Sequence, residues 1–107
     1  MNKERSATAE QLYRKDARVE VRSGGVRIDA KRRVDANDLG WADVVFAMER
    51  EHKVWLTTRF KDLRLPPIDV LDIPDDYTFM DPQLQEILRL TIDPEIEAWL
   101  TGKTKAP

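Results

Sequence analysis

The sequence predicts an α/β domain in which a small parallel sheet is flanked by helices. Strand-like and helix-like patterns alternate along the chain, which is typical of a parallel sheet with right-handed crossovers. One strand pattern is apolar almost throughout, as expected where both faces of a parallel sheet are covered. The length of 107 residues suits one modest core. We therefore expect a single domain over residues 1–101 and a frayed tail over residues 102–107.

The N-terminal part of the chain predicts one helix and one strand. Residues 6–15 have apolar side chains on one helical face, and Thr8 and Gln11 stand at capping-box spacing. Residues 19–22 have a strand pattern that ends at the turn residues 23–25.

The middle of the chain predicts a second strand between two helices. Residues 26–33 are basic and unpatterned, so we expect a loop that leads into a short helix around residues 35–41. Residues 43–48 form the nearly continuous apolar strand. Residues 49–60 follow as an amphipathic helix.

The C-terminal part predicts a third strand and two helices. The Leu-Pro-Pro sequence at residues 65–67 interrupts the helical pattern, and residues 68–71 form a strand pattern. Asp81-Pro82 combines an N-cap residue with a proline at the first helical position, which signals a helix start. Asp93-Pro94 repeats this signal, so we expect a separate final helix that runs to about residue 100.

The first ten residues have the features of a phosphate-binding loop that leads into a helix. Such a loop combines backbone N–H groups, a helix N-terminus and a guanidinium that holds two oxygens. Residues 2–10 read N-x-x-R-S-x-x-A-E. This string resembles the second half of C-x-x-N-x-x-R-S-x-x-A-E, the active-site loop of the low-molecular-weight protein tyrosine phosphatases. The resemblance implies a compact branch of this family with the phosphotyrosine protein phosphatase I-like fold.

Three further segments resemble the family in the same order along the chain. Residues 19–25 are similar to its second strand and to the Ser-Ala-Gly type turn that ends it. Residues 41–49 resemble its strand that begins with alanine and aspartate and leads to a methionine. Residues 70–77 stand where the family has its acid loop, an Asp-Pro followed by aromatic residues. The stretch between residues 25 and 41 is shorter than in the standard phosphatases.

The resemblance implies hydrolysis of phosphomonoesters through a phosphocysteine intermediate. It assigns the phosphate cradle to Asn2, Lys3, Glu4, Arg5 and Ser6. Arg5 is the catalytic clamp on the phosphoryl oxygens, a task that suits a planar guanidinium. An aspartic acid protonates the leaving group. By resemblance this acid is Asp72, with Asp75 and Asp76 as rivals, because Asp-Ile-Pro-Asp-Asp departs from the family's Asp-Pro.

Two features of the family are missing from the sequence. The nucleophilic cysteine would precede Met1 in this register, and the chain contains no cysteine. The first strand, which the family places in the interior of its sheet, is also absent, so we interpret the N-terminus as truncated. We therefore expect no phosphotyrosine turnover from this chain. Two alternatives stay open: a phosphate- or phosphopeptide-binding module, and a structural or regulatory protein that self-associates through an exposed sheet edge.

Composition argues against several other classes of function. The net charge is −2 and the pI is about 5.4, whereas nucleic-acid-binding domains usually carry a basic excess. The lack of cysteine excludes disulfides and thiolate metal sites, and we expect neither a metal nor another cofactor. The sequence has no apolar run long enough to span a membrane and no leader pattern, so we expect no membrane partner and a cytoplasmic location.

Overall fold

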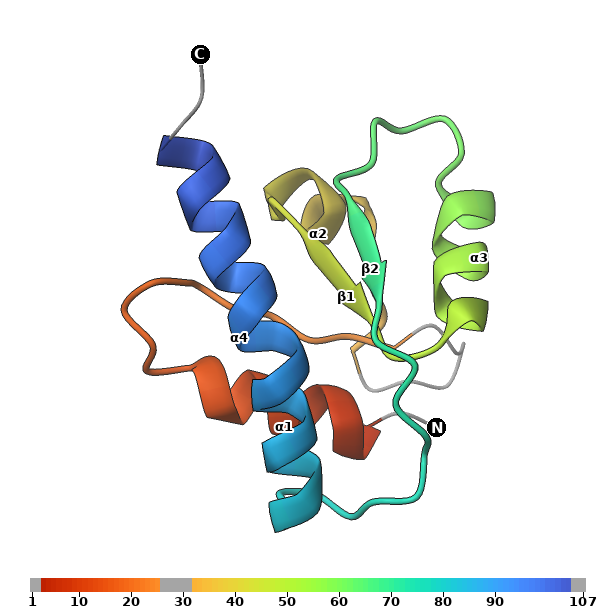
Figure 1. The fold of residues 1–107 in the computed structure, drawn as a ribbon. Coiled ribbons are helices and arrows are strands. Elements are labelled where there is room, and N and C mark those ends of the chain that lie inside the picture. Colours follow the sequence, from red (N-terminus) through yellow and green to blue (C-terminus); the bar gives the residue numbers. More distant parts are fainter. Residues whose placement is uncertain (1–2, 26–31, 105–107) are drawn as a thin grey trace.

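A computed structural model describes residues 3–25 and 32–104 of the chain. In chain order the elements are α1 (Lys3–Tyr13), α2 (Ala36–Trp41), β1 (Val45–Ala47), α3 (Arg50–Arg59), β2 (Ile68–Val70) and α4 (Pro82–Thr104). The two strands lie at the centre, with α3 on one side and α4 with α1 on the other (Figure 1). This arrangement confirms the predicted α/β class and its small parallel sheet.

The sheet consists of β1 and β2, which pair in parallel with Val45 opposite Ile68 and Ala47 opposite Val70. Neighbouring side chains of a strand point to opposite faces of the sheet. Accordingly, Phe46 packs against the main core cluster, whereas Ala47 is buried outside that cluster. Both strands are shorter than the sequence predicts, because only three residues of each take part in the pairing.

The hydrophobic core is provided mainly by α4. Leu84, Leu88, Ile92 and Ile96 recur every four residues and therefore lie on one face of this helix. The core cluster also includes residues from α1 and from the segments that follow β1 and β2. Its buried members are Tyr13, Met48, Ile73, Leu84, Leu88, Ile92 and Ile96. The core thus holds the ends of both strands close to α1.

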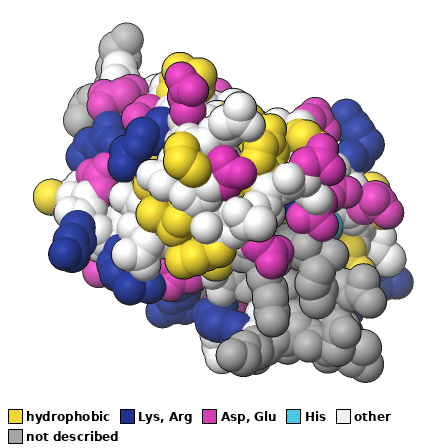
Figure 2. All heavy atoms as spheres, turned by 90° about the horizontal axis from the view of Figure 1, so that it is seen from below, with side chains coloured by type: hydrophobic (Ala, Val, Ile, Leu, Met, Phe, Trp, Pro, Cys, Tyr) yellow, Lys and Arg dark blue, Asp and Glu magenta, His cyan; other side chains and the backbone are white. Residues whose placement is uncertain are grey.

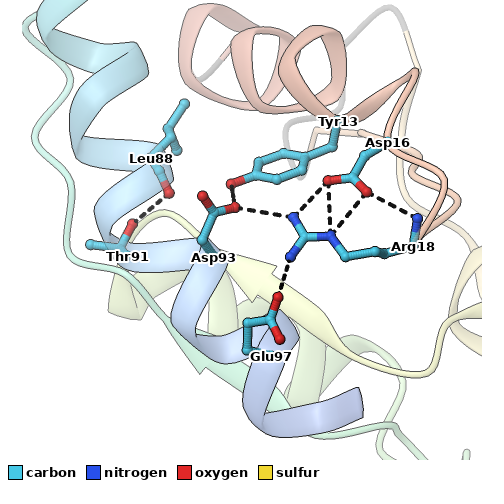
Figure 3. Close-up of polar contacts among 7 residues, drawn as sticks. All are labelled: Tyr13, Asp16, Arg18, Leu88, Thr91, Asp93 and Glu97. Carbon is cyan, nitrogen blue, oxygen red and sulfur yellow. Dashed lines mark hydrogen bonds and ion pairs between the residues drawn. The ribbon is translucent and has the colours of Figure 1, made fainter. Parts of the chain in front are cut away.

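Polar contacts also connect the end of α1 to α4 (Figure 3). The Tyr13 hydroxyl donates a hydrogen bond of 2.6 Å to Asp93 Oδ1. Arg18 forms ion pairs with Asp16 and Glu97, each with a nitrogen–oxygen distance of 2.7 Å. Burial, together with the bond to Asp93, raises the pKa of Tyr13 well above its usual value. Tyr13 therefore stays a neutral donor in this junction.

The first helix begins earlier than predicted, at Lys3 rather than at Ser6. Thr8 is therefore inside α1, and the capping box predicted for it is wrong. Its buried hydroxyl instead accepts a hydrogen bond of 2.9 Å from the backbone N–H of Met80. This contact satisfies a donor in the turn before α4, where Met80 has a left-handed φ of 62°.

The strand predicted at residues 19–22 does not form. Within the described residues, the N–H and C=O groups of residues 20–22 have no hydrogen-bond partner in the backbone. The physical reason is the lack of a neighbouring strand, since a strand is stable only when it pairs. A cavity of about 640 Å³, lined both by this segment and by residues 42–48, lies where a neighbour would be. We call it the edge cavity.

The prediction of a separate helix that starts at Asp93-Pro94 is wrong, because α4 continues through both residues. The Asp93 carboxylate is held by Tyr13 and Arg18 rather than by a helix start. Pro94 cannot donate a hydrogen bond to the carbonyl of Leu90. Leu90 is 69% exposed, so water can solvate that carbonyl and the helix tolerates the proline.

The other predicted helices and loops have mixed outcomes. The short helix expected around residues 35–41 is confirmed as α2, with Asp35 as its N-cap. The frayed tail begins later than predicted, because residues 102–104 are still helical. Residues 105–107, and most of the loop expected at 26–33, lie outside the described residues. In the part of the chain that the structure describes, no helix is both long and apolar enough to cross a bilayer.

Candidate functional site

Arg5 provides the buried positive charge of the candidate site. It lies in the first turns of α1, and its side chain is 1% exposed. The guanidinium donates a hydrogen bond to the carbonyl oxygen of Ile73. Its Nη2 is 2.6 Å from Glu49 Oε2, and its Nε is 3.7 Å from Asp75 Oδ1. Two carboxylates and a carbonyl thus compensate one buried cation, as the burial of a charge requires.

The carboxyl ends of the two parallel strands bring these groups to α1 (Figure 1). Glu49 follows β1 and is the N-cap residue of α3. Ile73 and Asp75 belong to the segment that follows β2. In open α/β sheets, ligands bind beyond the carboxyl ends of the strands. Arg5 therefore lies at the end of the sheet where a binding site is expected.

The charge of Arg5 changes the acidity of its neighbours. Its hydrogen bond lowers the pKa of the Glu49 carboxyl below the usual value. Burial lowers the pKa of the His52 imidazole, and repulsion from Arg5 lowers it further against the attraction of Glu49. At neutral pH, Glu49 is therefore an anion and His52 is uncharged.

One donor of Arg5 has no acceptor. Its Nε is buried and forms no hydrogen bond, since the 3.7 Å that separate it from Asp75 exceed the normal hydrogen-bond length. The backbone N–H groups of Lys3, Glu4 and Arg5 lie in the first turn of α1, where a helix offers no internal acceptors. A bound anion would satisfy donors of both kinds.

The predicted phosphate cradle is described only in part. Asn2 and the side chain of Lys3 lie outside the described residues. Glu4 and Ser6 are partly exposed on α1, and Ser6 lines the edge cavity. The loop conformation expected ahead of Ser6 is wrong for residues 3–5, which are helical. The acidic Glu4 in the first turn complements the helix dipole and favours this earlier start.

Asp75 is the predicted acid that the structure brings to Arg5. Asp72 and Asp76 are exposed, and within the described residues neither forms an ion pair with Arg5. Asp72 has a left-handed φ of 56°, a conformation that aspartate adopts more readily than most residues. The geometry therefore favours a turn role for Asp72 and a site role for Asp75.

Sequence reasoning missed Glu49, the closest charged partner of Arg5. A usable signal was present, because Glu49 directly follows the apolar strand pattern of residues 43–48. Polar residues at the carboxyl ends of parallel strands gather at one end of the sheet. No local rule, however, links residue 49 to residue 5, so the pairing becomes visible only in the folded chain.

Acidic side chains are prominent on the face seen from below in Figure 1. Figure 2 shows Asp and Glu side chains gathered on the right of this face. Their negative potential opposes the approach of an anion.

Comparisons with protein-family models, with curated proteins and with solved structures give no match to this chain. Among the described residues, no group of three or more His, Asp or Glu side chains is placed to hold a metal ion. Function is therefore inferred from the sequence motifs and from the geometry around Arg5.

Proposed function

We propose that Arg5 is the oxyanion-binding centre of a phosphatase-type site, like that of the low-molecular-weight protein tyrosine phosphatases that the sequence resembles. In this proposal the chain of 107 residues binds phosphate or a phosphoaryl group weakly and does not hydrolyse it. Hydrolysis of this type needs a thiolate nucleophile, and the sequence has no cysteine. The site holds the phosphoryl group but lacks the nucleophile.

The observation that carries the proposal is the buried guanidinium of Arg5 in the first turns of α1, with an Nε that forms no hydrogen bond. A planar guanidinium binds two oxygens of a phosphoryl group at once, which a lysine does not do. The helix dipole and the N–H groups of the first turn favour negative charge in the same region. Together these features support an oxyanion as the ligand.

Glu49 competes with the ligand for Arg5. Its Oε2 is 2.6 Å from Nη2 of Arg5, and its lowered pKa keeps it ionised in neutral solution. A phosphoryl group has to displace this carboxylate before the guanidinium can hold it with two bonds. Binding to the chain is therefore weak, although the site contains strong donors.

The proposal assigns the role of general acid to Asp75. Its carboxylate lies after β2 and 3.7 Å from Arg5 Nε, whereas within the described residues Asp72 and Asp76 form no ion pair with Arg5. An acid in this position lies beside a phosphoryl group held by Arg5 and can reach its leaving oxygen. Asp72 and Asp76 then serve as turn residues.

Phosphate titration of a Glu49→Gln variant tests the proposal. We expect about tenfold tighter binding of inorganic phosphate at pH 7, since the lost competition is worth roughly 1.4 kcal/mol. Isothermal titration calorimetry measures the affinity. Glu86→Gln changes the charge equally at an exposed position of α4 and is the matched control, with no change in affinity expected.

A second variant separates charge from geometry. Arg5→Lys, added to Glu49→Gln, keeps the positive charge but removes the planar fork, so we expect phosphate binding to be lost while circular dichroism shows a folded chain. Equal affinity in the parent chain and in Glu49→Gln contradicts the proposal. Phosphate binding that survives Arg5→Lys in a folded chain contradicts it as well.

A further inference from the structure

The edge cavity follows the edge of β1 rather than one face of the sheet. Every residue from 42 to 48 lines it, and so does every residue from 17 to 25. Since neighbouring residues of a strand point to opposite faces, a cavity lined by a whole run of them lies alongside the chain. Its volume of about 640 Å³ is far larger than the roughly 150 Å³ of a cavity that holds benzene.

Within the described residues, β1 has no neighbouring strand on the side of the edge cavity. In a parallel pair, alternate residues direct their N–H and C=O groups to the neighbouring strand. Val45 donates to the carbonyl of Pro67, and Ala47 accepts from the N–H of Leu71, so these two residues face β2. The N–H and C=O groups of Phe46 therefore point away from β2, toward the edge cavity.

The segment at residues 19–22 has a strand pattern without a partner. Val19 and Val21 are partly buried and pack against the core, whereas Glu20 and Arg22 are exposed. This alternation with a period of two is typical of a strand. Within the described residues, the backbone groups of residues 20–22 have no backbone hydrogen bond, so this segment also presents an unpaired edge.

We propose that the edge cavity accepts a β-strand from a partner polypeptide, which pairs with β1 on one side and with residues 19–22 on the other. Recognition by strand addition uses the backbone for affinity and the side chains for specificity. At roughly 3.3 Å per residue, about five or six residues cover most of the run from 42 to 48. This inference is independent of the phosphate site.

The lining of the edge cavity determines the chemistry of the strand. Tyr13 of α1 and Ile96 of α4 line it and belong to the main core cluster, and Leu39 of α2 and Leu56 of α3 line it from outside that cluster. All four are buried. A strand inserted here meets apolar side chains on both faces, so its sequence is a continuous apolar run, as in interior parallel strands.

A partner strand fits the cavity better than a second copy or a small molecule does. Within the described residues, β1 and β2 already pair with each other, and the remaining strand pattern, at residues 19–22, is interrupted by the charged Glu20 and Arg22, so a second copy has no continuous apolar run to donate. A small apolar ligand would leave the N–H and C=O groups of Phe46 and of residues 20–22 unpaired beside it. A peptide strand satisfies them along its whole length.

Binding of a synthetic peptide tests the inference. The probe has five consecutive valine, isoleucine and leucine residues between two lysines that keep it soluble. Trp41 and Trp99 line the edge cavity, so their fluorescence reports binding. We expect saturable binding and protection of the Phe46 amide from hydrogen exchange by at least tenfold. The control peptide has the same sequence with an N-methyl group on each of the five apolar residues, so it has no N–H donor for a strand on either edge.

Each outcome decides for or against a strand partner. Binding and Phe46 protection with the unmethylated peptide alone support the inference. Equal binding of the N-methylated peptide shows an apolar ligand pocket and overturns it. Dimerisation in sedimentation experiments, with Phe46 already protected in the chain alone, identifies a second copy as the occupant and also overturns it. The inference fails if neither peptide changes the fluorescence or the exchange rate.

Discussion

The buried guanidinium of Arg5 joins two parts of the chain that the sequence singled out separately. The motif at residues 2–10 predicted Arg5, and the resemblance to the acid loop predicted a group of three aspartates. The structure places one of them, Asp75, beside Arg5. Glu49 could not be predicted as a partner, because its contact depends on where β1 ends relative to α1. The motifs thus identified Arg5 and Asp75, whereas Glu49 became visible only in the folded chain.

Tyr13→Phe tests the polar junction between α1 and α4. We expect it to lower the free energy of unfolding at pH 7 by about 1 to 2 kcal/mol, since a hydrogen bond to a carboxylate is lost. The raised pKa of Tyr13 means that the folded chain keeps this proton above pH 10, whereas the unfolded chain releases it. The stability due to Tyr13 is therefore complete below pH 10 and is lost as the pH rises further.

Urea unfolding at pH 7 and pH 10.5 measures this effect. The parent chain should lose more stability between the two values than Tyr13→Phe does. Tyr77→Phe is the control, because Tyr77 also packs against the core but has no hydrogen bond to Asp93. An alkaline loss of equal size in the parent chain and in Tyr13→Phe would show that the Asp93 bond does not hold the proton.

Local sequence patterns predicted a helix or strand correctly where its partners in the fold were present. They predicted it wrongly where contacts with distant residues, or the lack of them, decided the structure. Residues 19–22 have the alternation of a strand but no partner, so the strand is not formed. Asp93 has the residue type of a helix cap, but Tyr13 and Arg18 bind its carboxylate. In both cases the sequence pattern describes a local preference, and contacts with distant residues decide the outcome.

Pro94→Ala tests whether α4 is one helix that tolerates a proline. Alanine restores the backbone donor to the Leu90 carbonyl, so we expect a gain of about 1 to 3 kcal/mol in stability. The thermal midpoint should then rise by several degrees or more. Pro82→Ala is the matched control, because proline is favourable at the first position of a helix and its removal brings no gain.

An unchanged or lower midpoint for Pro94→Ala would contradict this view of α4. It would mean that the proline shapes the helix for packing against α1. Circular dichroism during thermal unfolding of the two variants and the parent chain distinguishes these results.

For the whole molecule, the alternation of patterns was enough to predict the α/β class and the parallel pairing. The edge cavity was not predictable, because it results from the distance between two segments that are far apart in sequence. Its position between residues 19–22 and β1 is where the proposed phosphatase-like fold would need a further strand. The edge cavity is therefore relevant both to the proposed phosphatase-type site and to the proposed binding of a partner strand.

An extended chain allows both parts of the account to be tested in one molecule. An apolar strand of five residues followed by Cys-x is fused ahead of Met1, so that Cys-x-Met1-Asn2 matches the register of C-x-x-N-x-x-R-S. The strand is expected to fill the edge cavity and to raise the thermal midpoint by several degrees or more, because it buries apolar side chains. The cysteine would complete the loop in front of Arg5 and supply the nucleophile.

Hydrolysis of para-nitrophenyl phosphate by this extended chain at mildly acid pH tests the central claim, that Arg5 belongs to a phosphatase-type site. We expect turnover that disappears when the added cysteine is replaced by serine and when Arg5→Lys is introduced, and that falls with Asp75→Asn but not with Asp76→Asn. An extended chain that melts higher than the parent yet shows no turnover would contradict the claim.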